Sequence, residues 1–284
     1  MTPNQDRLPS TAKRRELGTE LRRIRKRAGY TGGELGLQLN WNASTISRLE
    51  KGLSKVEDGR VALYLARAGA TPAELDDLVT LDRRPDDGYQ VRPHPAGCPD
   101  SLPIITMLDT ESTSITTYDP VEVPRHLQVE TYIRNSRGYD HCHDLDTILR
   151  TRLHSQQSSF RHPRSFTFYI PETVLGGQIG CPTVAHAQLS HLLIASSLPH
   201  CRIHLVPTGA GLADIRTAFT LYQHDDHRPV IHCQLPSISL FLENDHDIAF
   251  FESYLERITR PALSRQETRD WLTGRLAKLE ATPG

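Results

Sequence analysis

Hydrophobic residues recur every three or four positions near the start of the chain, which is the period of an amphipathic helix. From Glu16 to Ala28 they stand at Leu17, Leu21, Ile24 and Ala28. Charged side chains occupy the other face, and Gly29 follows the last hydrophobic position. The pattern predicts a helix that ends at this glycine.

The next stretch, Tyr30 to Gly52, predicts two short helices separated by a tight turn. Thr31 and Glu34 have the T-x-x-E spacing of a capping box, so a helix should begin near Thr31. Asn40 tolerates the left-handed conformation that ends a helix. The inward-facing positions of the second helix are Ala43, Ile46 and Leu49. We expect a helix-turn-helix, with Gly36 where the two helices approach closely.

Two more helices are expected before residue 83. Inward positions in the first, Val56–Ala68, are Val61, Leu65 and Ala68. The second begins at Thr71, because Pro72 takes the first helical position and Glu74 completes another capping box. Its inward positions are Leu75, Leu78 and Val79. Together the pattern predicts a compact all-α domain of five helices over residues 1–82.

The pattern changes after residue 82. Residues 83–103 hold five prolines and several Asp and Gly, which predicts a linker that resists regular structure. The predicted strands beyond it are Ser114–Tyr118, Phe166–Ile170, Ile203–Val206, Ala218–Tyr222, Val230–Cys233 and Ile238–Leu242, the last four as an antiparallel meander. The predicted helices are Asp144–Ser159, Thr183–Ser197, Asp245–Ile258 and Ser264–Leu279. Residues 104–284 are therefore expected to form an α+β domain with a largely antiparallel sheet.

Charge is distributed unevenly along the 284 residues. Residues 1–70 carry fourteen Lys or Arg against seven Asp or Glu, whereas the whole chain has a net charge of −1. A basic first domain on an acidic second one is typical of a nucleic-acid-binding protein, because phosphate neutralisation supplies much of the affinity. No hydrophobic run approaches the roughly 18 residues that span a bilayer. The first fifteen residues are polar and basic, so we expect a cytoplasmic protein without a membrane partner.

Cysteine and histidine offer little support for a disulfide or metal site. The five cysteines are scattered and form no C-x-x-C pair, which favours reduced thiols. The densest cluster among the fourteen histidines is Asp140–Asp144, DHCHD, whose spacing does not match a helical zinc site. We read it as a polar loop and a helix start, and expect no metal.

At residues 16 to about 81 the sequence resembles the Xre family, the phage-repressor and Cro-like helix-turn-helix regulators. The segments ELGTELRRIRKRAGYTGGELG and STISRLEKG follow the family's LGxxLRxLRxxxGxTQxELA and STISRxExG. The resemblance makes Asn42–Glu50 the recognition helix and Arg25 with Glu50 a structural salt bridge between the first and third helices. By the same match the base-reading positions are Asn42, Ala43, Ser44 and Arg48.

Only one of these positions carries a long side chain, which predicts weak reading of DNA sequence by one copy. A bidentate contact from Arg48 to guanine is worth about 1 to 3 kcal/mol. A homodimer on double-stranded DNA would add a second half-site and phosphate contacts. The expected phosphate contacts are Arg22, Arg23, Lys26, Thr31, Lys51 and Lys55, although the basic ones could equally be a solvated face. Gly32 stands where the family usually has a phosphate-contacting Gln.

The C-terminal half resembles, more loosely, the sensory-type domain of unknown function found behind Xre heads in actinobacterial regulators. VPRHLQVETYIR is similar to VPGLLQTxxYAR, RTRLHSQQ to RxxRQ, and AHAQLSHLL with HLVPTGAG to MxxQLxHLL and VxPxxxG, although Arg125, His126 and Val129 depart from the pattern. The polar residues of these motifs are Gln128, Tyr132, Arg152, Gln156 and Gln188. They line a ligand pocket or satisfy one another in a packed network. The resemblance implies a small-molecule effector or a small partner protein.

Motifs of common enzyme classes are missing from the sequence. It contains no G-x-S-x-G, no Walker A sequence and no G-x-G-x-x-G after a strand, so we expect neither catalysis nor a cofactor. Glu172 near Gly176, Gly177 and Gly180 has two interpretations. It is an acid beside a mobile loop, or the glycines simply end one helix before another begins near Pro182.

These patterns favour a sequence-specific DNA-binding transcriptional regulator, homodimeric and modulated through its C-terminal domain. One alternative is a regulator-derived scaffold with a vestigial DNA-binding head, repurposed as a natural-product pathway enzyme or ligand-binding protein. Another is a protein-binding adaptor or antagonist. The operator, the effector and the direction of regulation are not encoded in any motif.

Overall fold

Two compact units make up the chain in this computed structural model, which describes residues 10–54, 59–94, 102–136, 145–161, 164–176 and 181–281. Unit 1 comprises Met1–Tyr89 with Asp226–Arg228, and unit 2 comprises Gln90–Asp225 with Pro229–Gly284. Among the described residues, no helix combines the length and hydrophobicity that crossing a membrane requires.

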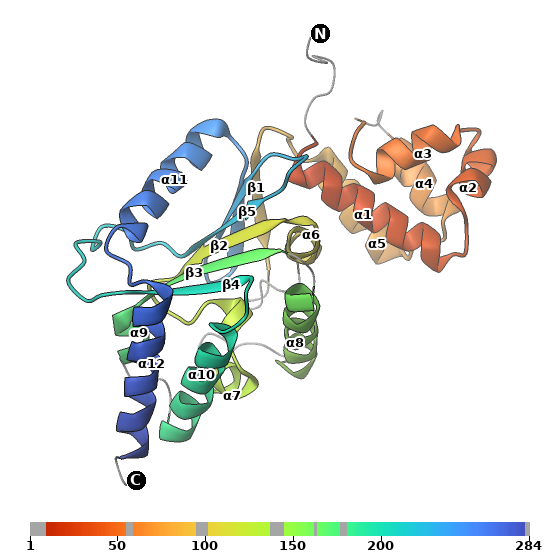
Figure 1. Ribbon diagram of the computed structural model, residues 1–284. Helices are drawn as coiled ribbons and strands as arrows, with labels where there is room; N and C mark the ends of the chain where they lie inside the picture. Colours follow the sequence, from red (N-terminus) through yellow and green to blue (C-terminus); the bar gives the residue numbers. More distant parts are fainter. Residues whose placement is uncertain are drawn as a thin grey trace. The chain divides into compact units, whose positions relative to one another are not determined.

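Unit 1 contains the five predicted helices (Figure 1). They are α1 (Ala12–Arg27), α2 (Gly32–Leu39), α3 (Ala43–Glu50), α4 (Arg60–Arg67) and α5 (Pro72–Arg83). Their hydrophobic stripes meet in one core that includes Leu21, Ile24, Leu35, Ile46 and Leu65. Helix α1 begins four residues earlier than the hydrophobic period predicted, because the Thr11 side chain caps it by accepting a hydrogen bond from the backbone N–H of Arg14.

The predicted helix ends in unit 1 are formed by their own side chains. Thr31 and Glu34 make a reciprocal capping box at the start of α2, and Thr71 and Glu74 make another at the start of α5. Asn40 ends α2 in the left-handed conformation, with a φ of 56°. The turn into α3 follows directly.

Glycine allows two close approaches of backbone in unit 1. A Cβ on Gly36 would lie 2.7 Å from the carbonyl oxygen of Trp41, in the turn between α2 and α3. A Cβ on Gly18 would lie 2.5 Å from the carbonyl oxygen of Glu50, where α1 meets the end of α3. Gly36 therefore has the predicted role, and Gly18 has a similar one that the sequence did not indicate.

Unit 2 is built on a seven-stranded mixed sheet with the order β1-β7-β6-β5-β2-β3-β4. The strands are β1 (Tyr89–Pro93), β2 (Ser114–Tyr118), β3 (Ser165–Pro171), β4 (Cys201–Val206), β5 (Phe219–Gln223), β6 (Val230–Gln234) and β7 (Ile238–Leu242). Strands β2, β3 and β4 run parallel to one another. Strand β5 is antiparallel to β2, β6 to β5, and β7 to β6. The α+β class and the largely antiparallel sheet are as predicted.

Two details of the predicted topology are wrong. Strand β4 does not join the meander, because it pairs in parallel with β3 at the far edge of the sheet, and only β5, β6 and β7 form the meander. The stretch expected to resist regular structure contains β1, which pairs with β7 at the opposite edge. Its prolines are compatible with this place, since an edge strand leaves one row of backbone groups unpaired.

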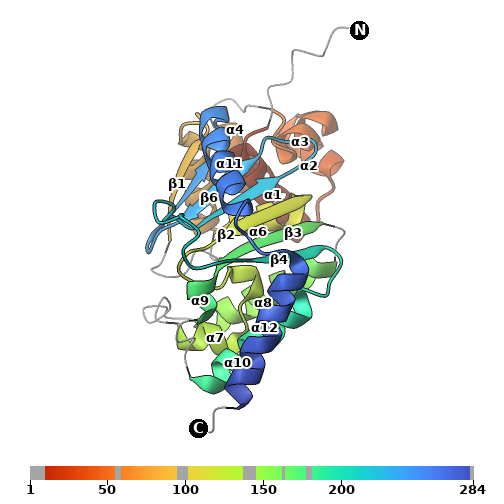
Figure 2. The same cartoon turned by 60° about the vertical axis from the view of Figure 1, so that its left-hand side comes forward.

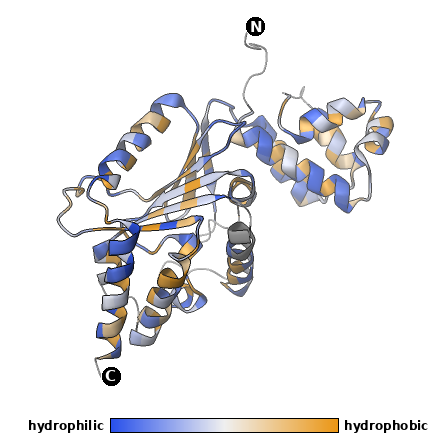
Figure 3. Ribbon diagram, in the orientation of Figure 1, coloured by the Kyte–Doolittle hydropathy of each residue, from blue (hydrophilic) through white to orange (hydrophobic). Residues whose placement is uncertain are grey.

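Helices cover both faces of the sheet (Figures 1 and 2). On one face lies α11 (Asp245–Thr259), packed on a core that includes Tyr118, Tyr169 and Phe219. The other helices of unit 2 are α6 (Pro103–Glu111), α7 (Glu130–Asn135), α8 (Leu145–Arg161), α9 (Glu172–Gly176), α10 (Pro182–Ala195) and α12 (Arg265–Glu280), with a 3-10 turn at Arg125–Leu127. Figure 3 shows hydrophilic and hydrophobic sides on α11, as expected for a helix that covers a core.

Candidate nucleic-acid interface and ligand cavity

The end of α3 is anchored to α1 by a buried ion pair. Arg25 Nε lies 2.6 Å from Glu50 Oε1, and Arg25 Nη2 lies 2.7 Å from Oε2, so the pair is bidentate. The hydroxyl of Tyr64 donates a third hydrogen bond to Glu50 Oε1 at 2.6 Å. Burial, together with this bond, raises the pKa of Tyr64 above its ordinary value. The two residues predicted to pair thus fix α3 against α1, with Tyr64 as a partner on α4.

The front of α3 is open to solvent. Asn42, Ala43, Ser44 and Arg48 are all exposed, and only Ile46 and Leu49 of this helix are buried. The inward position expected for Ala43 is therefore wrong, because the core of unit 1 is filled by the next turns of α3. Asn42 occupies the N-cap position without a side-chain capping bond, which leaves its amide available to a ligand.

The residues expected to contact phosphate differ in whether they already form ion pairs within unit 1. Arg22, Lys26 and Lys51 are exposed. Arg23, by contrast, pairs with Glu20 and with Glu74, each at 2.8 Å. Contact with DNA would require Arg23 to leave these carboxylates, so it is the weakest of the basic candidates. Lys55 lies outside the described residues, as does the Asp140–Asp144 cluster.

Helix α2 begins with a capping box, but glycine occupies position 32, where the resembled family usually has a Gln side chain. Thr31 donates its backbone N–H to Glu34 Oε2 at 2.7 Å and accepts the N–H of Glu34 at 3.2 Å. A Cβ on Gly32 would meet only a methyl group of Ile46, at 3.6 Å, which is an ordinary contact. Nothing in the fold therefore requires glycine at position 32.

Four of the five polar residues of the C-terminal motifs bind backbone groups, and the fifth, Arg152, binds the side chain of Gln128. Arg152 donates to Gln128 Oε1 at 2.7 Å, and Gln128 donates to the carbonyl of Val123 at 2.7 Å. The remaining three do the same: Gln156 donates to the carbonyls of Arg125 and Gln128, Gln188 donates to that of Leu127, and the Tyr132 hydroxyl accepts the N–H of Val123. Of the two interpretations left open by the sequence, this geometry favours the packed network, which holds the segment 122–129 in place.

Arg125 and His126, which depart from the resembled motif, both contact the buried Asp109. Arg125 forms an ion pair with Asp109, and His126 Nε2 lies 2.9 Å from its Oδ1. The hydroxyl of Tyr222 donates to the same oxygen at 3.2 Å. Burial alone would raise the pKa of Asp109, but the charges of Arg125 and His126 outweigh it and hold that pKa below its usual range. The unusual residues therefore compensate one buried carboxylate.

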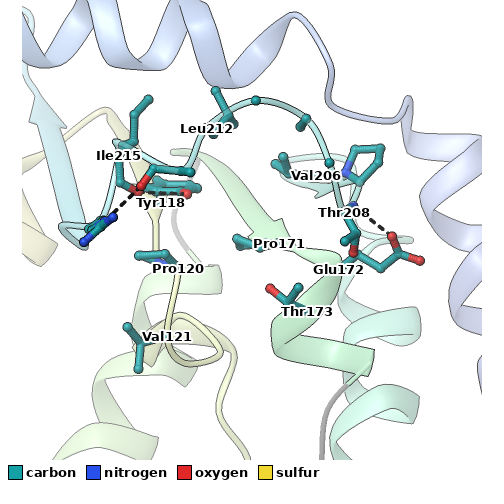
Figure 4. A pocket seen from close by; sticks show the side chains of 16 residues that line it. Tyr118, Pro120, Val121, Pro171, Glu172, Thr173, Val206, Thr208, Leu212 and Ile215 are labelled. Atoms are coloured by element: carbon teal, nitrogen blue, oxygen red, sulfur yellow. Dashed lines mark hydrogen bonds between the residues drawn. The ribbon is translucent and has the colours of Figure 1, made fainter.

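A cavity of about 590 Å³ opens where the three parallel strands end. Its lining includes Tyr118, Pro171 and Val206, which are the last residues of β2, β3 and β4. The connection from β4 to β5 returns across the same end and contributes residues 207–213 with Ile215 and Arg216 (Figure 4). None of the five polar motif residues lines this cavity.

Glu172 lies at one edge of the cavity, with its carboxylate on the side of α12 (Figure 4). Its Oε2 accepts the backbone N–H of Thr208 at 2.9 Å, and its Oε1 accepts the indole N–H of Trp271 at 3.1 Å. These two bonds hold the side chain between the β4–β5 connection and α12. They also stabilise the charged form, so that the pKa of Glu172 lies below its ordinary value, with the Thr208 N–H as the larger cause.

Comparison with known proteins places the larger part of the chain in a family. Residues 103–274 match the domain of unknown function DUF5753.

The chain belongs to the DUF5753 family. Ahead of this domain, residues 16–78 match a helix-turn-helix domain, which supports DNA binding by unit 1. No match was found among the curated proteins. One solved structure that resembles the chain is described as "Structure of TrmBL2, an archaeal chromatin protein, shows a novel mode of DNA binding". The two chains are 9% identical with a TM-score of 0.35, and the match covers 72% of this chain and 65% of that one.

Sequence reasoning missed part of both sites. Tyr64 was not expected to bind Glu50, since the inward positions predicted for this helix were Val61, Leu65 and Ala68. In the DUF5753 domain, Glu172 was noticed beside its glycines, but the cavity was not. Its walls come from three strand ends and a connection far away in the sequence, so no local pattern marks them.

Proposed function

We propose that the protein is a cytoplasmic, sequence-specific transcriptional regulator of the Xre type, of actinobacterial kind, that binds double-stranded DNA as a homodimer. Its DUF5753 domain acts as a sensor of a small molecule or a partner protein rather than as a catalyst. The input shifts the population between arrangements of the two DNA-binding units, and so changes how well both half-sites fit.

The observation that carries this proposal is the exposed front of α3 on a rigid support. Asn42, Ser44 and Arg48 project from a helix whose far end is fixed by the Arg25–Glu50 ion pair and by Tyr64. A helix that reads base edges needs such support, since a shift of its axis moves every side chain in the groove. Arg22, Lys26 and Lys51 provide exposed positive charge in the same unit.

Homodimerisation follows from the limited reading power of one copy. Arg48 is the one long side chain among the four expected base-reading residues, and Ala43 offers only a methyl contact. Two copies read two half-sites, so that discrimination doubles in free energy while each unit stays small. A homodimer would thus combine a short recognition surface in each copy with specificity for a DNA sequence.

The test is a gel-shift titration with DNA from upstream of the protein's own coding sequence. Arg48→Ala should weaken binding by about tenfold or more, because a bidentate contact is lost in each half-site. Arg67→Ala, at the end of α4, is the matched control for lost charge and should bind as wild type. Equal affinity for all three proteins, with unchanged circular dichroism, would overturn the assignment of the recognition helix.

A gain-of-function variant sharpens this test. Gly32→Gln introduces the side chain that the resembled family usually has at this position, and its Cβ would make only an ordinary contact with Ile46. We expect tighter DNA binding and a steeper loss of affinity with salt. Gly33→Gln, one position along the same helix, is the matched control.

A further inference from the structure

The cavity at the strand ends has the position of a ligand site. Ligands of open sheets bind beyond the carboxyl ends of parallel strands, where the loops diverge and backbone groups are free. Here Tyr118, Pro171 and Val206 form the strand ends, and the β4–β5 connection passes over them (Figure 4). The volume of about 590 Å³ falls within the range of roughly 300 to 1,000 Å³ that small-molecule sites occupy.

The wall of this cavity is mostly hydrophobic. Pro120 and Val121 line it from the segment that follows β2, and Pro171 lines it from the end of β3. Leu212 and Ile215 line it from the β4–β5 connection (Figure 4). Tyr118 also lines it, but its hydroxyl already donates to the carbonyl of Ile215 at 3.3 Å. A ligand that fills the space must therefore present a largely apolar surface.

One charged group in the wall has a fixed position and no counter-charge. Glu172 is held by the N–H of Thr208 and the indole of Trp271, both of which are neutral donors. Among the described residues no Lys, Arg or His forms an ion pair with it. Each carboxylate oxygen retains a lone pair, so Glu172 can accept a further hydrogen bond from a cationic donor without giving up those it has.

We propose that this cavity binds a hydrophobic amine, an apolar small molecule whose single ammonium group is bound by Glu172. The apolar body occupies the space between Val121 and Leu212. The ammonium group supplies the counter-charge that Glu172 lacks among the residues the structure describes. A charge-assisted hydrogen bond of this kind is stronger than one between neutral groups.

Arg216 is the other charged residue in the lining, and it is held less firmly than Glu172. It is exposed, and its Nε is bound to the carbonyl of Ala213 at 2.9 Å. It has one partner from its own loop, whereas Glu172 is fixed by two elements that lie 36 and 99 residues away in sequence. The prearranged charge in the cavity is therefore the negative one.

This inference deepens the proposed function and rests on it in one respect, namely that the amine acts as the effector. The site itself depends only on unit 2. Binding of the amine and its effect on DNA affinity are therefore measured separately.

The test uses three probes of the same shape on the full-length protein: 4-phenylbutylamine, 4-phenylbutanol and 4-phenylbutyrate. Isothermal titration calorimetry measures the affinity for each at pH 7. We expect the amine to bind about tenfold tighter than the alcohol, the increment of one charge-assisted bond, and the butyrate to bind weakest. Equal binding of amine and alcohol, or tightest binding of butyrate, would overturn the proposal.

Variants locate the site. Glu172→Gln should abolish the preference for the amine, whereas Arg216→Gln should keep it. Val121→Trp should block all three probes by filling the cavity, and Val121 is 73% exposed, so the fold tolerates the change. Ile194→Trp, on α10 and 68% exposed, is the control away from the cavity. Unchanged binding by Val121→Trp would show that the probes bind elsewhere.

A gel shift with and without 4-phenylbutylamine then separates the two proposals. A change in DNA affinity that disappears in Glu172→Gln supports the amine as effector. Amine binding with unaltered DNA affinity supports the cavity site and rules out its regulatory role. DNA binding that is insensitive to Arg48→Ala contradicts the proposed function and leaves the calorimetric result for the cavity standing.

Discussion

Single side chains in unit 1 act over very different distances along the chain. Thr31 with Glu34 and Thr71 with Glu74 lie three residues apart, and both pairs form the capping boxes that their spacing predicts. Glu50 instead binds Arg25, 25 residues before it, and Tyr64, 14 residues after it. The first kind of contact is visible in the sequence because the helix alone brings the partners together. The second kind exists only after three helices have packed.

The substitution Glu50→Gln tests how much a contact between residues distant in sequence stabilises unit 1. The substitution removes the negative charge and directs an amide N–H at a donor of Arg25. The pair is well buried, since the side chains of Arg25 and Glu50 are 10% and 6% exposed. Breaking a buried pair from one side costs about 3 to 5 kcal/mol, so the free energy of unfolding of unit 1 should fall by that amount. Urea unfolding followed by Trp41 fluorescence, in a Trp271→Phe background, measures it.

Glu20→Gln is the matched control for this prediction. Its partner Arg23 is 49% exposed, and an exposed pair contributes about 0 to 1 kcal/mol. Similar losses in the two variants would mean that the Glu50 network does not anchor α3.

Glycines help to position whole helices in unit 1. The effect of each glycine on stability depends on the atoms around it. A Cβ on Gly33, in the first turn of α2, would have its nearest neighbour at 4.0 Å, so glycine there only weakens the helix. Gly18 faces the backbone of Glu50 and lets α1 and α3 touch. The sequence drew attention to Gly32 only for the side chain that it lacks and did not single out Gly18, because a glycine's neighbours depend on packing.

The two glycines should therefore respond to alanine in opposite directions. Gly33→Ala should raise the free energy of unfolding of unit 1 by about 0.5 to 1 kcal/mol. Gly18→Ala should lower it by about 1 to 3 kcal/mol, since α1 must move away from α3. The same urea titration measures both, and a stabilising Gly18→Ala would contradict the close approach.

The strands of unit 2 show the same difference between local properties and properties that depend on packing. Most strands of unit 2 were located within a few residues from their β-branched and aromatic content. Their partners were not, and β4 was placed beside β5 although it pairs with β3. Strand propensity is a local property, whereas pairing depends on which edge of the sheet β4 occupies once the domain has packed. Strand β1 escaped prediction because its flanking prolines resemble a linker.

At the scale of the whole molecule, the proposed homodimer makes a geometric prediction. Two recognition helices on one face of B-DNA bind half-sites whose centres lie about 10 to 10.5 base pairs apart, or a multiple of this. Once an operator has been selected from random DNA, inserting about 5 base pairs between the half-sites should abolish tight binding, because it turns one site to the opposite face. Inserting about 10 should restore most of it.

The control for this spacing experiment is an equal insertion outside both half-sites, which should leave affinity unchanged. Binding that tolerates every insertion would contradict a dimer with a fixed distance between its reading helices. The Lys51→Ala variant should lower affinity on all these sites alike, since a phosphate contact carries no sequence information.

The sequence by itself determined the helix-turn-helix, the helix ends of unit 1 and the α+β character of unit 2, because hydrophobic period, capping and strand propensity act between near neighbours. It also predicted Arg48 and its neighbours as a reading surface, and this stays a prediction. Only the tertiary structure decided the order of the strands, the hydrogen bond between Gln128 and Arg152, and the cavity beside Glu172. These depend on residues far apart in the chain, which folding alone brings together.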